Sequence, residues 1–527
     1  MKSTKKLISA LIAVIMILSL FASCGDPLED NSTDDGITSE NTTAAPSATG
    51  SGVESTPESS ENTETSESTE ETAESTPEES TTFIDLESLL PPEINLDKDM
   101  SVLVQMLYYD EWLDKDNGDI VGTELYNRPV RVEDRLGIEL NIEIVPQSNG
   151  VEEAIKRQES TDPNVIVQAI TTYCPTAGRL VLEGRYRNLA SSDNIDFENP
   201  WWPDNLVENS MIDDKIYFVS GDISPTLIYE TYAIFFNLDL IEKYNIGNPI
   251  DMVLNKEWTI DKLIELTSGI YEDLDKSVSG PNMGDFFAFT IADTAHIKAF
   301  PFGMGIRVIV PDEESGYAWS ELYTGEKMSI ICDKIGAWVQ NNPGVTASNE
   351  TGYSDHGDSF KNENTIFHLG NFACAAQVIA GTGIDYGVVP CPLYDGEQEQ
   401  YYSYYGNPTS FWGVPSNADI DDACLLIEYL AADAYVYISP ALFERALKLK
   451  YVTGEVDGLS KMFDIIRDGF VFDVCMPYTG KFSVTYNEFV AITTGASSWS
   501  NQFDRFAKKS MKSALDSIVT TIRKLEY

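Results

Sequence analysis

Basic residues are scarce in this 527-residue sequence, and their scarcity excludes some classes of partner. There are 35 lysines and arginines against 85 aspartates and glutamates, which gives a formal net charge of −50. Proteins bind nucleic acids largely through Lys and Arg side chains that neutralise phosphates. We therefore expect no nucleic-acid partner, and no direct attachment of this acidic surface to an anionic membrane.

Metal-binding and catalytic patterns are also missing. The three histidines are His296, His356 and His368, and no HExxH spacing occurs. Apart from Cys24, the six cysteines are widely spaced without a CxxC pair, so we expect small buried hydrophobic residues rather than a disulfide framework. No P-loop, GxGxxG or GxSxG is present. We expect no cofactor, no metal and no catalytic residue.

One acidic segment has some features of a calcium loop. The stretch from Asp114 to Glu124 has the composition of an EF-hand, but its glycine and its final glutamate fall at positions 5 and 11. An EF-hand loop needs them at positions 6 and 12. A solvated acidic loop is the preferred interpretation.

The N-terminus has the pattern of an export signal. Three lysines (Lys2, Lys5 and Lys6) precede an apolar run from Leu7 to Phe21, and the small pair Ala22-Ser23 comes directly before Cys24. This junction resembles the lipobox of bacterial lipoproteins, although Phe21 stands where that pattern usually has Leu. The resemblance implies a signal peptide over 1–23 and a lipidated Cys24. The alternative is an ordinary secretory signal with a chance cysteine.

The segment after Cys24 has the composition of a tether. Residues 25–82 contain sixteen acidic residues and no Lys or Arg, and consist almost entirely of small and polar residues. Such a segment cannot bury enough apolar surface to offset the loss of chain entropy. We expect 24–82 to be a disordered acidic linker that carries the lipid at Cys24.

The remaining chain predicts an α/β fold. Strand-like runs at 101–107, 138–145 and 164–171 alternate with helix-like stretches at 123–136 and 151–158, an order that is typical of a parallel sheet. Further along, a strand at 232–237 is followed by helices at 238–244 and 259–271. Near the C-terminus, apolar residues recur at helical spacing up to Leu525, which indicates a packed helix.

Four segments resemble the family 1 extracellular solute-binding proteins, which are receptors of ABC sugar importers. The stretch from Lys215 to Lys262 contains Phe236-Asn237 and Trp258-Thr259 at the family's positions. The segments 127–145, 360–372 and 386–390 resemble three further parts of the family pattern, although Glu363-Asn364 replaces the usual glycine. The resemblance covers about 97–527.

This resemblance implies a two-lobed periplasmic-binding-protein-like fold, in which each lobe is a mostly parallel sheet flanked by helices. It places lobe one at 97–228 and 386–432, and lobe two at 229–385 and 433–527. In such proteins the ligand binds between the lobes, which close by hinge bending.

Aromatic and carboxylate side chains are the expected ligand contacts, because sugars stack C–H faces on rings and offer hydroxyls to polar groups. Tyr109, Asp110 and Trp112 follow the first strand and Tyr173 follows another, where a crevice is expected in an open α/β sheet. Trp201 and Trp202 lie between two prolines. The alternative for this pair is that it fixes a loop to the core.

The resemblance adds residues at the lobe crossings. Glu230 and Tyr232 lie where the family places a hydroxyl-accepting carboxylate, with a structural hinge ion pair as the alternative for Glu230. Asn371 and Phe372 match the family's stacking position in lobe two. Tyr405 and Trp412 belong to an aromatic cluster on a predicted loop.

The function that these features predict is capture of a carbohydrate, an oligosaccharide in particular, by a monomeric lipoprotein that is not an enzyme. The expected location is the outer face of the cytoplasmic membrane, and the expected partners are the permease subunits of an ABC importer. Two alternatives remain: a secreted glycoside hydrolase, which needs two carboxylates across a cleft, and a surface glycan sensor without a transporter.

Overall fold

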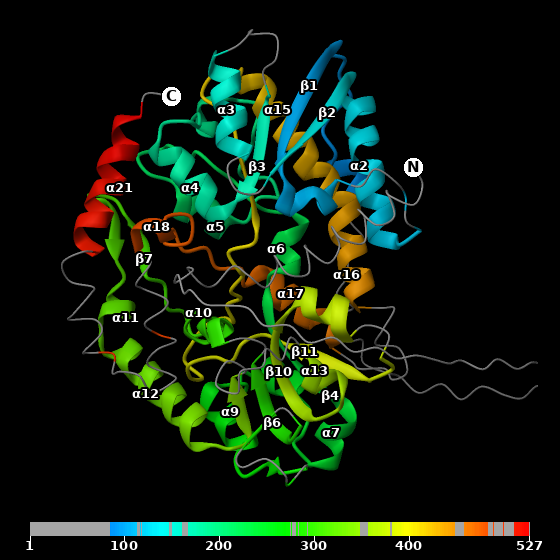
Figure 1. The fold of residues 1–527 in the computed structure, drawn as a ribbon, viewed down its shortest axis with the longest axis vertical. Coiled ribbons are helices and arrows are strands. Elements are labelled where there is room, and N and C mark those ends of the chain that lie inside the picture. Colours follow the sequence, from blue (N-terminus) through cyan, green and yellow to red (C-terminus); the bar gives the residue numbers. More distant parts are fainter. Residues whose placement is uncertain are drawn as a thin grey trace, which may run out of the picture. The chain divides into compact units, whose positions relative to one another are not determined.

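The structure is a computed structural model (Figure 1), and it describes the following residues: 85–112, 116, 118–146, 150–160, 167–274, 276, 281–282, 284–291, 294–347, 357–379, 382–447, 458–482, 489, 499 and 511–525. Residues 86–527 belong to one compact unit that contains the sheets described below. The signal peptide, Cys24 and the linker up to Thr82 lie outside the described residues, so those expectations stay predictions.

The first sheet has four strands in the order β12-β3-β1-β2. Strand β1 is parallel to both β2 and β3, whereas β12 is antiparallel to β3. Both parallel partners follow β1 along the chain, as the alternation of strands and helices predicted. The strands span Lys98–Gln105 (β1), Ile138–Val145 (β2), Ala169–Tyr173 (β3) and Ser410–Gly413 (β12).

Helices pack around this sheet. The helix α2 begins after Asp119, whose side chain accepts a hydrogen bond from the Gly122 N–H, and it ends at Gly137 in the left-handed conformation with φ +62°. Asp116 accepts hydrogen bonds from the Gly118 N–H and the Thr123 hydroxyl. The carboxylates of Asp116 and Asp119 therefore stabilise the turn at the start of α2. Part of the calcium-like loop lies outside the described residues.

The helices in the region of the first sheet are α2 (Ile120–Leu136), α3 (Gly150–Ser160), α4 (Cys174–Leu182), α5 (Asp204–Ser210) and α15 (Ile420–Asp433).

The second sheet has the order β11-β4-β10-β6-β5, with β9 paired to β6. Its central strands are mostly apolar, and all six residues of β4 and of β6 are buried, as expected for strands covered on both faces. The strands span Tyr232–Asn237 (β4), Tyr271–Glu272 (β5), Phe286–Ile291 (β6), Val345–Ala347 (β9), Thr365–Asn371 (β10) and Tyr386–Val389 (β11).

Helices and a hairpin complete this part of the molecule. The short helices after β4 begin at side-chain caps from Asn237, Asn248 and Thr259. Strands β7 (Ile309–Asp312) and β8 (Gly316–Trp319) form a separate hairpin. The helices span α7 (Leu238–Lys243), α8 (Pro249–Leu254), α9 (Ile260–Leu266), α10 (Ala299–Gly303), α11 (Glu321–Thr324), α12 (Glu326–Asn341), α13 (Asp358–Lys361), α14 (Phe372–Cys374), α17 (Leu459–Asp468) and α18 (Thr479–Phe482).

Three segments connect the regions of the two sheets. The first runs from Val219, which bridges to Trp412 in the first sheet, through helix α6 (Pro225–Tyr229) to β4. The second runs from β11 to β12. The third is helical, since α15 continues through the π-helical segment η7 (Ala434–Ile438) into α16 (Ser439–Leu447) (Figure 1).

The expected lobe boundaries as a whole stay a prediction. The contacts of two segments, however, differ from their expected assignment. Residues 386–389 were assigned to lobe one, but β11 pairs with β4 in the second sheet because its Gly387 allows close approach to Phe236. The C-terminal helix α21 (Lys512–Lys524) was assigned to lobe two, but it packs on α4 as well as on β8.

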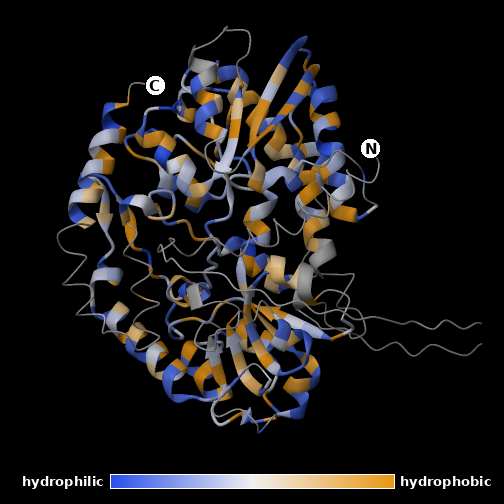
Figure 2. Cartoon of the chain, viewed as in Figure 1, coloured by the Kyte–Doolittle hydropathy of each residue, from blue (hydrophilic) through white to orange (hydrophobic). Residues whose placement is uncertain are grey.

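Apolar side chains gather between the sheets and the helices that cover them. Figure 2 shows the hydrophobic residues in orange and the hydrophilic residues in blue along these elements. The helix Ile420–Phe443 is the one described helix that is long and apolar enough to cross a membrane by length and composition. In its most apolar window 78% of the residues are buried inside the protein, which is typical of a core helix.

Candidate functional site

Carboxyl side chains gather at the carboxyl end of β1, in the short helix η2 (Met106–Glu111). Glu111 is buried, and its Oε1 atom accepts hydrogen bonds from the Ser410 hydroxyl at 3.0 Å and from the Thr226 N–H at 3.2 Å. Burial raises the pKa of Glu111 to about 7, and the charge of Asp110 adds to the shift. Glu111 therefore joins β12 and α6 to the end of β1.

Glu230 closes helix α6 at the first connection between the sheets. The Asn371 amide at the end of β10 donates a hydrogen bond to its Oε2 atom at 3.0 Å, and the Gly406 N–H donates to its backbone carbonyl at 2.9 Å. The side chain is 6% exposed, and burial raises its pKa to about 7 against the opposing effect of the Asn371 bond. Asn371 in turn caps α14 by accepting from the Cys374 N–H. The predicted residues Glu230 and Asn371 are thus in direct contact.

Asp110 extends this group toward the first sheet. The residue is exposed to solvent, yet the protein around its carboxyl group raises its pKa to about 6, and its charge acts on Glu230. We call Asp110, Glu230 and Asn371 the carboxyl–amide centre. It combines the ends of β1 and β10 with α6, and its oxygens and amide can accept or donate hydrogen bonds to hydroxyl groups.

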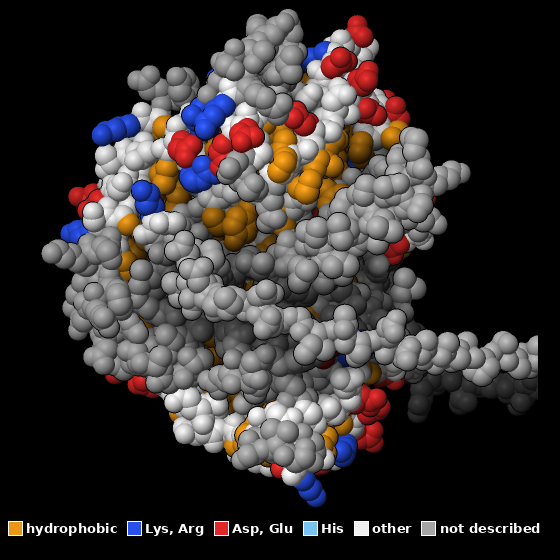
Figure 3. Space-filling model, in the orientation of Figure 1, with side chains coloured by type: hydrophobic (Ala, Val, Ile, Leu, Met, Phe, Trp, Pro, Cys, Tyr) orange, Lys and Arg blue, Asp and Glu red, His pale blue; other side chains and the backbone are white. Residues whose placement is uncertain are grey.

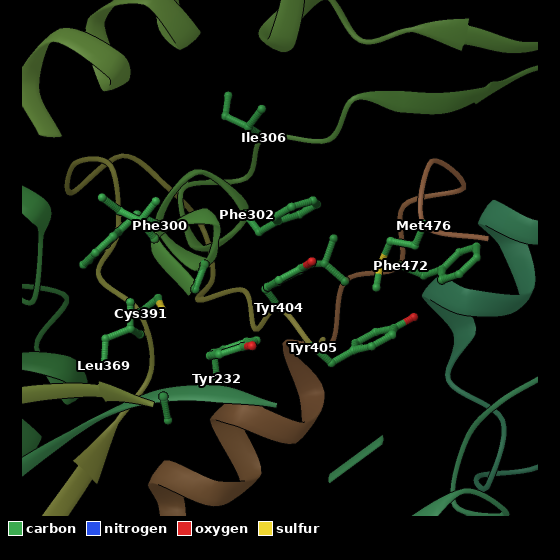
Figure 4. Close-up of a cluster of buried hydrophobic side chains, with 14 of the residues drawn as sticks. Tyr232, Phe300, Phe302, Ile306, Leu369, Cys391, Tyr404, Tyr405, Phe472 and Met476 are labelled. Atoms are coloured by element: carbon green, nitrogen blue, oxygen red, sulfur yellow. The ribbon is translucent and has the colours of Figure 1, made fainter. Parts of the chain in front are cut away.

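Stacked rings lie beside this centre. Phe302 stacks on Tyr404 with ring centroids 4.4 Å apart, Tyr404 stacks on Tyr232 at 5.6 Å, and Tyr232 contacts His296 at 4.7 Å. Figure 4 shows that the rings of Tyr232, Phe302 and Tyr404 come from separate chain segments and that Tyr405 lies beside them. Tyr232 and Tyr405 are 5% and 1% exposed, so most of their surface serves packing.

Two predicted contacts, Trp112 and Trp412, lie in the core of the first sheet. Their ring centroids are 6.0 Å apart, and the Arg128 guanidinium lies 4.8 Å from the Trp112 ring and 5.7 Å from the Trp412 ring. All three side chains are buried. Trp412 was expected on a loop, but it lies on β12, whose four residues are too few to show an alternating pattern. The rings stabilise the core that positions Asp110.

The tryptophan pair Trp201-Trp202 is also largely buried. The Trp202 Nε1 atom donates to Glu428 at 3.0 Å, and the Trp201 ring packs on Tyr435. These contacts agree with the alternative that the pair fixes its loop to the core. Trp202 in addition lines a cavity beside α17.

The remaining predicted contacts have mixed exposure. Tyr109 and Tyr173 are half-buried, whereas Phe372 is 4% exposed and packs edge-on against Phe235. Ligand contact by each predicted residue stays a prediction.

Glu111 and Arg128 take part in this region although the sequence did not single them out. Glu111 is adjacent to Asp110, and a buried acidic residue in a short helix has no sequence signal that separates it from an exposed one. Arg128 resembles any surface residue of an amphipathic helix. Its burial depends on Trp412, which is far away in the sequence.

The charge distribution is uneven. Figure 3 shows acidic side chains grouped over the region of β1, β2 and α2. Within the described part of the chain, no group of three or more His, Cys, Asp or Glu side chains is arranged to hold a metal ion.

Comparisons with known proteins give the fold. No family model and no curated protein sequence matches the chain. Among solved structures, the cyclic alpha-maltosyl-1,6-maltose binding protein of Arthrobacter globiformis is 13% identical with a TM-score of 0.51, over 80% of this chain and 98% of that one.

Two further matches are the maltose-binding periplasmic protein MalE of Listeria monocytogenes and a family 1 extracellular solute-binding protein of Bifidobacterium longum subsp. infantis. Both are 16% identical with TM-scores of 0.49, and both alignments span 82% of this chain; they cover 99% and 100% of those chains. The Arthrobacter match, with the two sheets described above, confirms the expected fold class: the chain has the two-lobed, periplasmic-binding-protein-like α/β fold.

Proposed function

We propose that the protein captures a carbohydrate, an oligosaccharide in particular, between its two lobes. The observation that supports this most is the carboxyl–amide centre, which brings together groups from both sheets and from the first connection between them. Carboxyl and amide groups with solvent access on one side suit the hydroxyls of a sugar, and the fold is built for hinge closure.

The finer parts of the proposal rest on the sequence. The lipobox-like junction and the acidic linker support a lipid anchor at Cys24 and a position outside the cytoplasmic membrane, where a diacylated cysteine would hold the protein. Delivery to the permease of an ABC importer, and action as a monomer without catalysis, complete the proposal. A glycan sensor would share all of these features except the transporter.

The test is a panel of oligosaccharides, with thermal unfolding and sugar release measured in parallel. We expect one glycan class to raise the melting temperature by roughly 5 °C at a concentration about 100 times Kd, because the ligand stabilises only the folded state. Glu230→Gln and Asn371→Ala should both weaken this binding. Glu242→Gln, a change at an exposed position of α7, is the matched control.

The same assay separates capture from hydrolysis. A glycoside hydrolase also uses two carboxyl groups, one of which has a raised pKa, and Asp110 and Glu230 both have raised pKa values. Release of reducing sugar from any panel member would replace capture by hydrolysis. A panel that covers the main glycan classes and gives no thermal shift would contradict the proposal.

A further inference from the structure

Buried polar side chains without a hydrogen-bond partner gather beside the first sheet. The four residues of this donor cluster are each 6% exposed or less: Trp112, Arg128, Thr171 and Trp412. The Nε1 atoms of both tryptophans, the Nε and Nη1 atoms of Arg128 and the Thr171 hydroxyl have no hydrogen-bond partner among the described residues. Buried polar groups of folded proteins are mostly hydrogen-bonded. The donor cluster therefore indicates a bound group that accepts these hydrogen bonds.

The members of the donor cluster lie close together although they come from different elements. Trp412 of β12 pairs with Thr171 of β3, so the two side chains leave the same face of the sheet. The Arg128 guanidinium, from α2, lies 4.8 Å from the Trp112 ring and 5.7 Å from the Trp412 ring. The centroids of these two rings are 6.0 Å apart. The unpartnered atoms thus share one region of the core.

Arg128 brings a positive charge into this region. Its Nη2 atom donates to the Ile223 carbonyl at 3.1 Å, and among the described residues it forms no ion pair. Glu111 and Asp433 act on it through their charges, without a hydrogen bond. Burial lowers the pKa of Arg128 to about 10, so the side chain still carries its charge at pH 7. A buried charge without a close counter-charge is costly.

The chemistry of the unpartnered atoms selects an acceptor with negative charge. Guanidinium and indole N–H groups can only donate, and a hydroxyl can donate as well. Arg128 repels a cation. A water molecule accepts from some of these donors but leaves the charge of Arg128 without a counter-charge. A small anion accepts from several donors at once and supplies that charge.

We propose that the donor cluster binds a small monovalent anion of the size of chloride. The ion connects α2, β3 and β12 with the segment that follows η2, and so stabilises the core of the first sheet. None of its four ligands belongs to the carboxyl–amide centre. The site therefore does not depend on the proposed capture of carbohydrate.

The test is thermal unfolding of the full chain in sodium chloride, titrated against sodium gluconate at constant ionic strength. Gluconate is too large for a site enclosed by packed side chains. Chloride should raise the melting temperature along a saturable curve, by roughly 4 °C at a concentration about 100 times Kd. Bromide should quench part of the tryptophan emission with a saturable dependence on concentration, because the bound ion contacts Trp112 and Trp412.

Thr171→Val and Thr172→Val form a matched pair of variants. Both threonines are fully buried neighbours on β3, and their side chains lie on opposite faces of the sheet. Thr171→Val should weaken chloride binding about fivefold through the loss of one hydrogen bond, whereas Thr172→Val should leave it unchanged. Arg128→Met, which removes the charge and keeps a long side chain, should abolish the response to chloride.

Three results would overturn the proposal. Equal melting temperatures of the unaltered protein in chloride and in gluconate would mean that water alone satisfies the donors. A response of Arg128→Met equal to that of the unaltered protein would show that chloride binds elsewhere. If Arg128→Met does not fold, the threonine pair decides, and an equal chloride affinity of its two variants rejects the site.

Discussion

The pKa of Glu230 makes this single residue a source of pH dependence. Its carboxyl group is 6% exposed, and burial raises its pKa from 4.5 to about 7. Between these values the folded protein keeps the proton that the unfolded chain has lost. The free energy of unfolding therefore falls as the pH rises from about 4.5 to about 7. Glu111 and Asp110, which face the same region, act in the same direction.

We predict that Glu230→Gln raises the free energy of unfolding by about 2 kcal/mol at pH 8 and leaves it nearly unchanged at pH 4.5. Glutamine resembles the protonated acid, and its carbonyl oxygen can still accept the bond from the Asn371 amide. Urea denaturation at both pH values measures the effect. An equal gain at both values would mean that the ionisation of Glu230 is not the cause.

A second residue-scale prediction concerns Gly387 in β11. A Cβ atom at this position would lie 2.1 Å from the Phe236 ring, whereas a Cβ at Gly396 would meet nothing within 4 Å. We expect Gly387→Ala to lower the free energy of unfolding by about 2–3 kcal/mol, because the ring is packed and cannot move aside. Gly396→Ala, the control, should change it by less than about 0.5 kcal/mol. Equal denaturation midpoints for the two variants would contradict the strand pairing.

At the scale of elements, an ion pair joins the first connection to two helices. Asp222 accepts bonds from Arg467 of α17 and from Ser439 at the start of α16. The Asp222 side chain is 8% exposed, and burial raises its pKa even though Arg467 opposes the shift. The pair therefore fixes the relative positions of α16, α17 and the connection.

We predict that Arg467→Met lowers the free energy of unfolding by about 3 kcal/mol at pH 7, because a buried carboxylate loses its partner. The double variant Asp222→Asn with Arg467→Met should recover most of this loss, since it leaves no unpaired charge. A double-mutant cycle measured by urea denaturation gives the coupling energy. Additive losses would show that the two side chains do not interact.

Elements with a clear pattern could be predicted from the sequence. Strands β2 and β4 match the predicted ranges, because Gly137 precedes the first and an asparagine cap ends the second. The predicted strand at 164–171 overlaps β3 but ends two residues before β3 does, and residues 167–168 precede the paired segment. Strand β12 was missed, because four residues between turns have no periodicity and depend on pairing with β3.

The candidate site was predicted less completely. The family resemblance predicted Glu230 and Asn371 as separate ligand contacts, and it gave no sign that the two side chains bond each other. The burial of Trp112 and Trp412 could not be expected. A tryptophan that packs in a core and a tryptophan that stacks on a ligand are the same residue type, and the sequence alone does not distinguish them. The position of Arg128 beside these two rings depends on tertiary packing alone, so the sequence could not predict it.

At the scale of the whole molecule, the arrangement of the two sheets predicts closure on the ligand. We expect the radius of gyration of residues 85–527 to decrease when the glycan with the largest thermal shift is added, as small-angle X-ray scattering can measure. The carboxyl–amide centre joins groups from both sheets, so a bound ligand favours their approach. An unchanged radius with saturating glycan would indicate a rigid site rather than a closing one.

The tryptophans of this fold have an optical consequence. All eight lie among the described residues, and Trp202 alone lines the cavity between the first connection and α17. Trp112, Trp258 and Trp412 emit from cores that a rigid-body movement of the lobes leaves unchanged. Trp202 is itself buried, but the cavity that it lines lies beside α17, so a movement of α17 changes the surroundings of this ring. Its emission is therefore expected to shift with lobe movement, whereas that of Trp112, Trp258 and Trp412 is expected to stay constant.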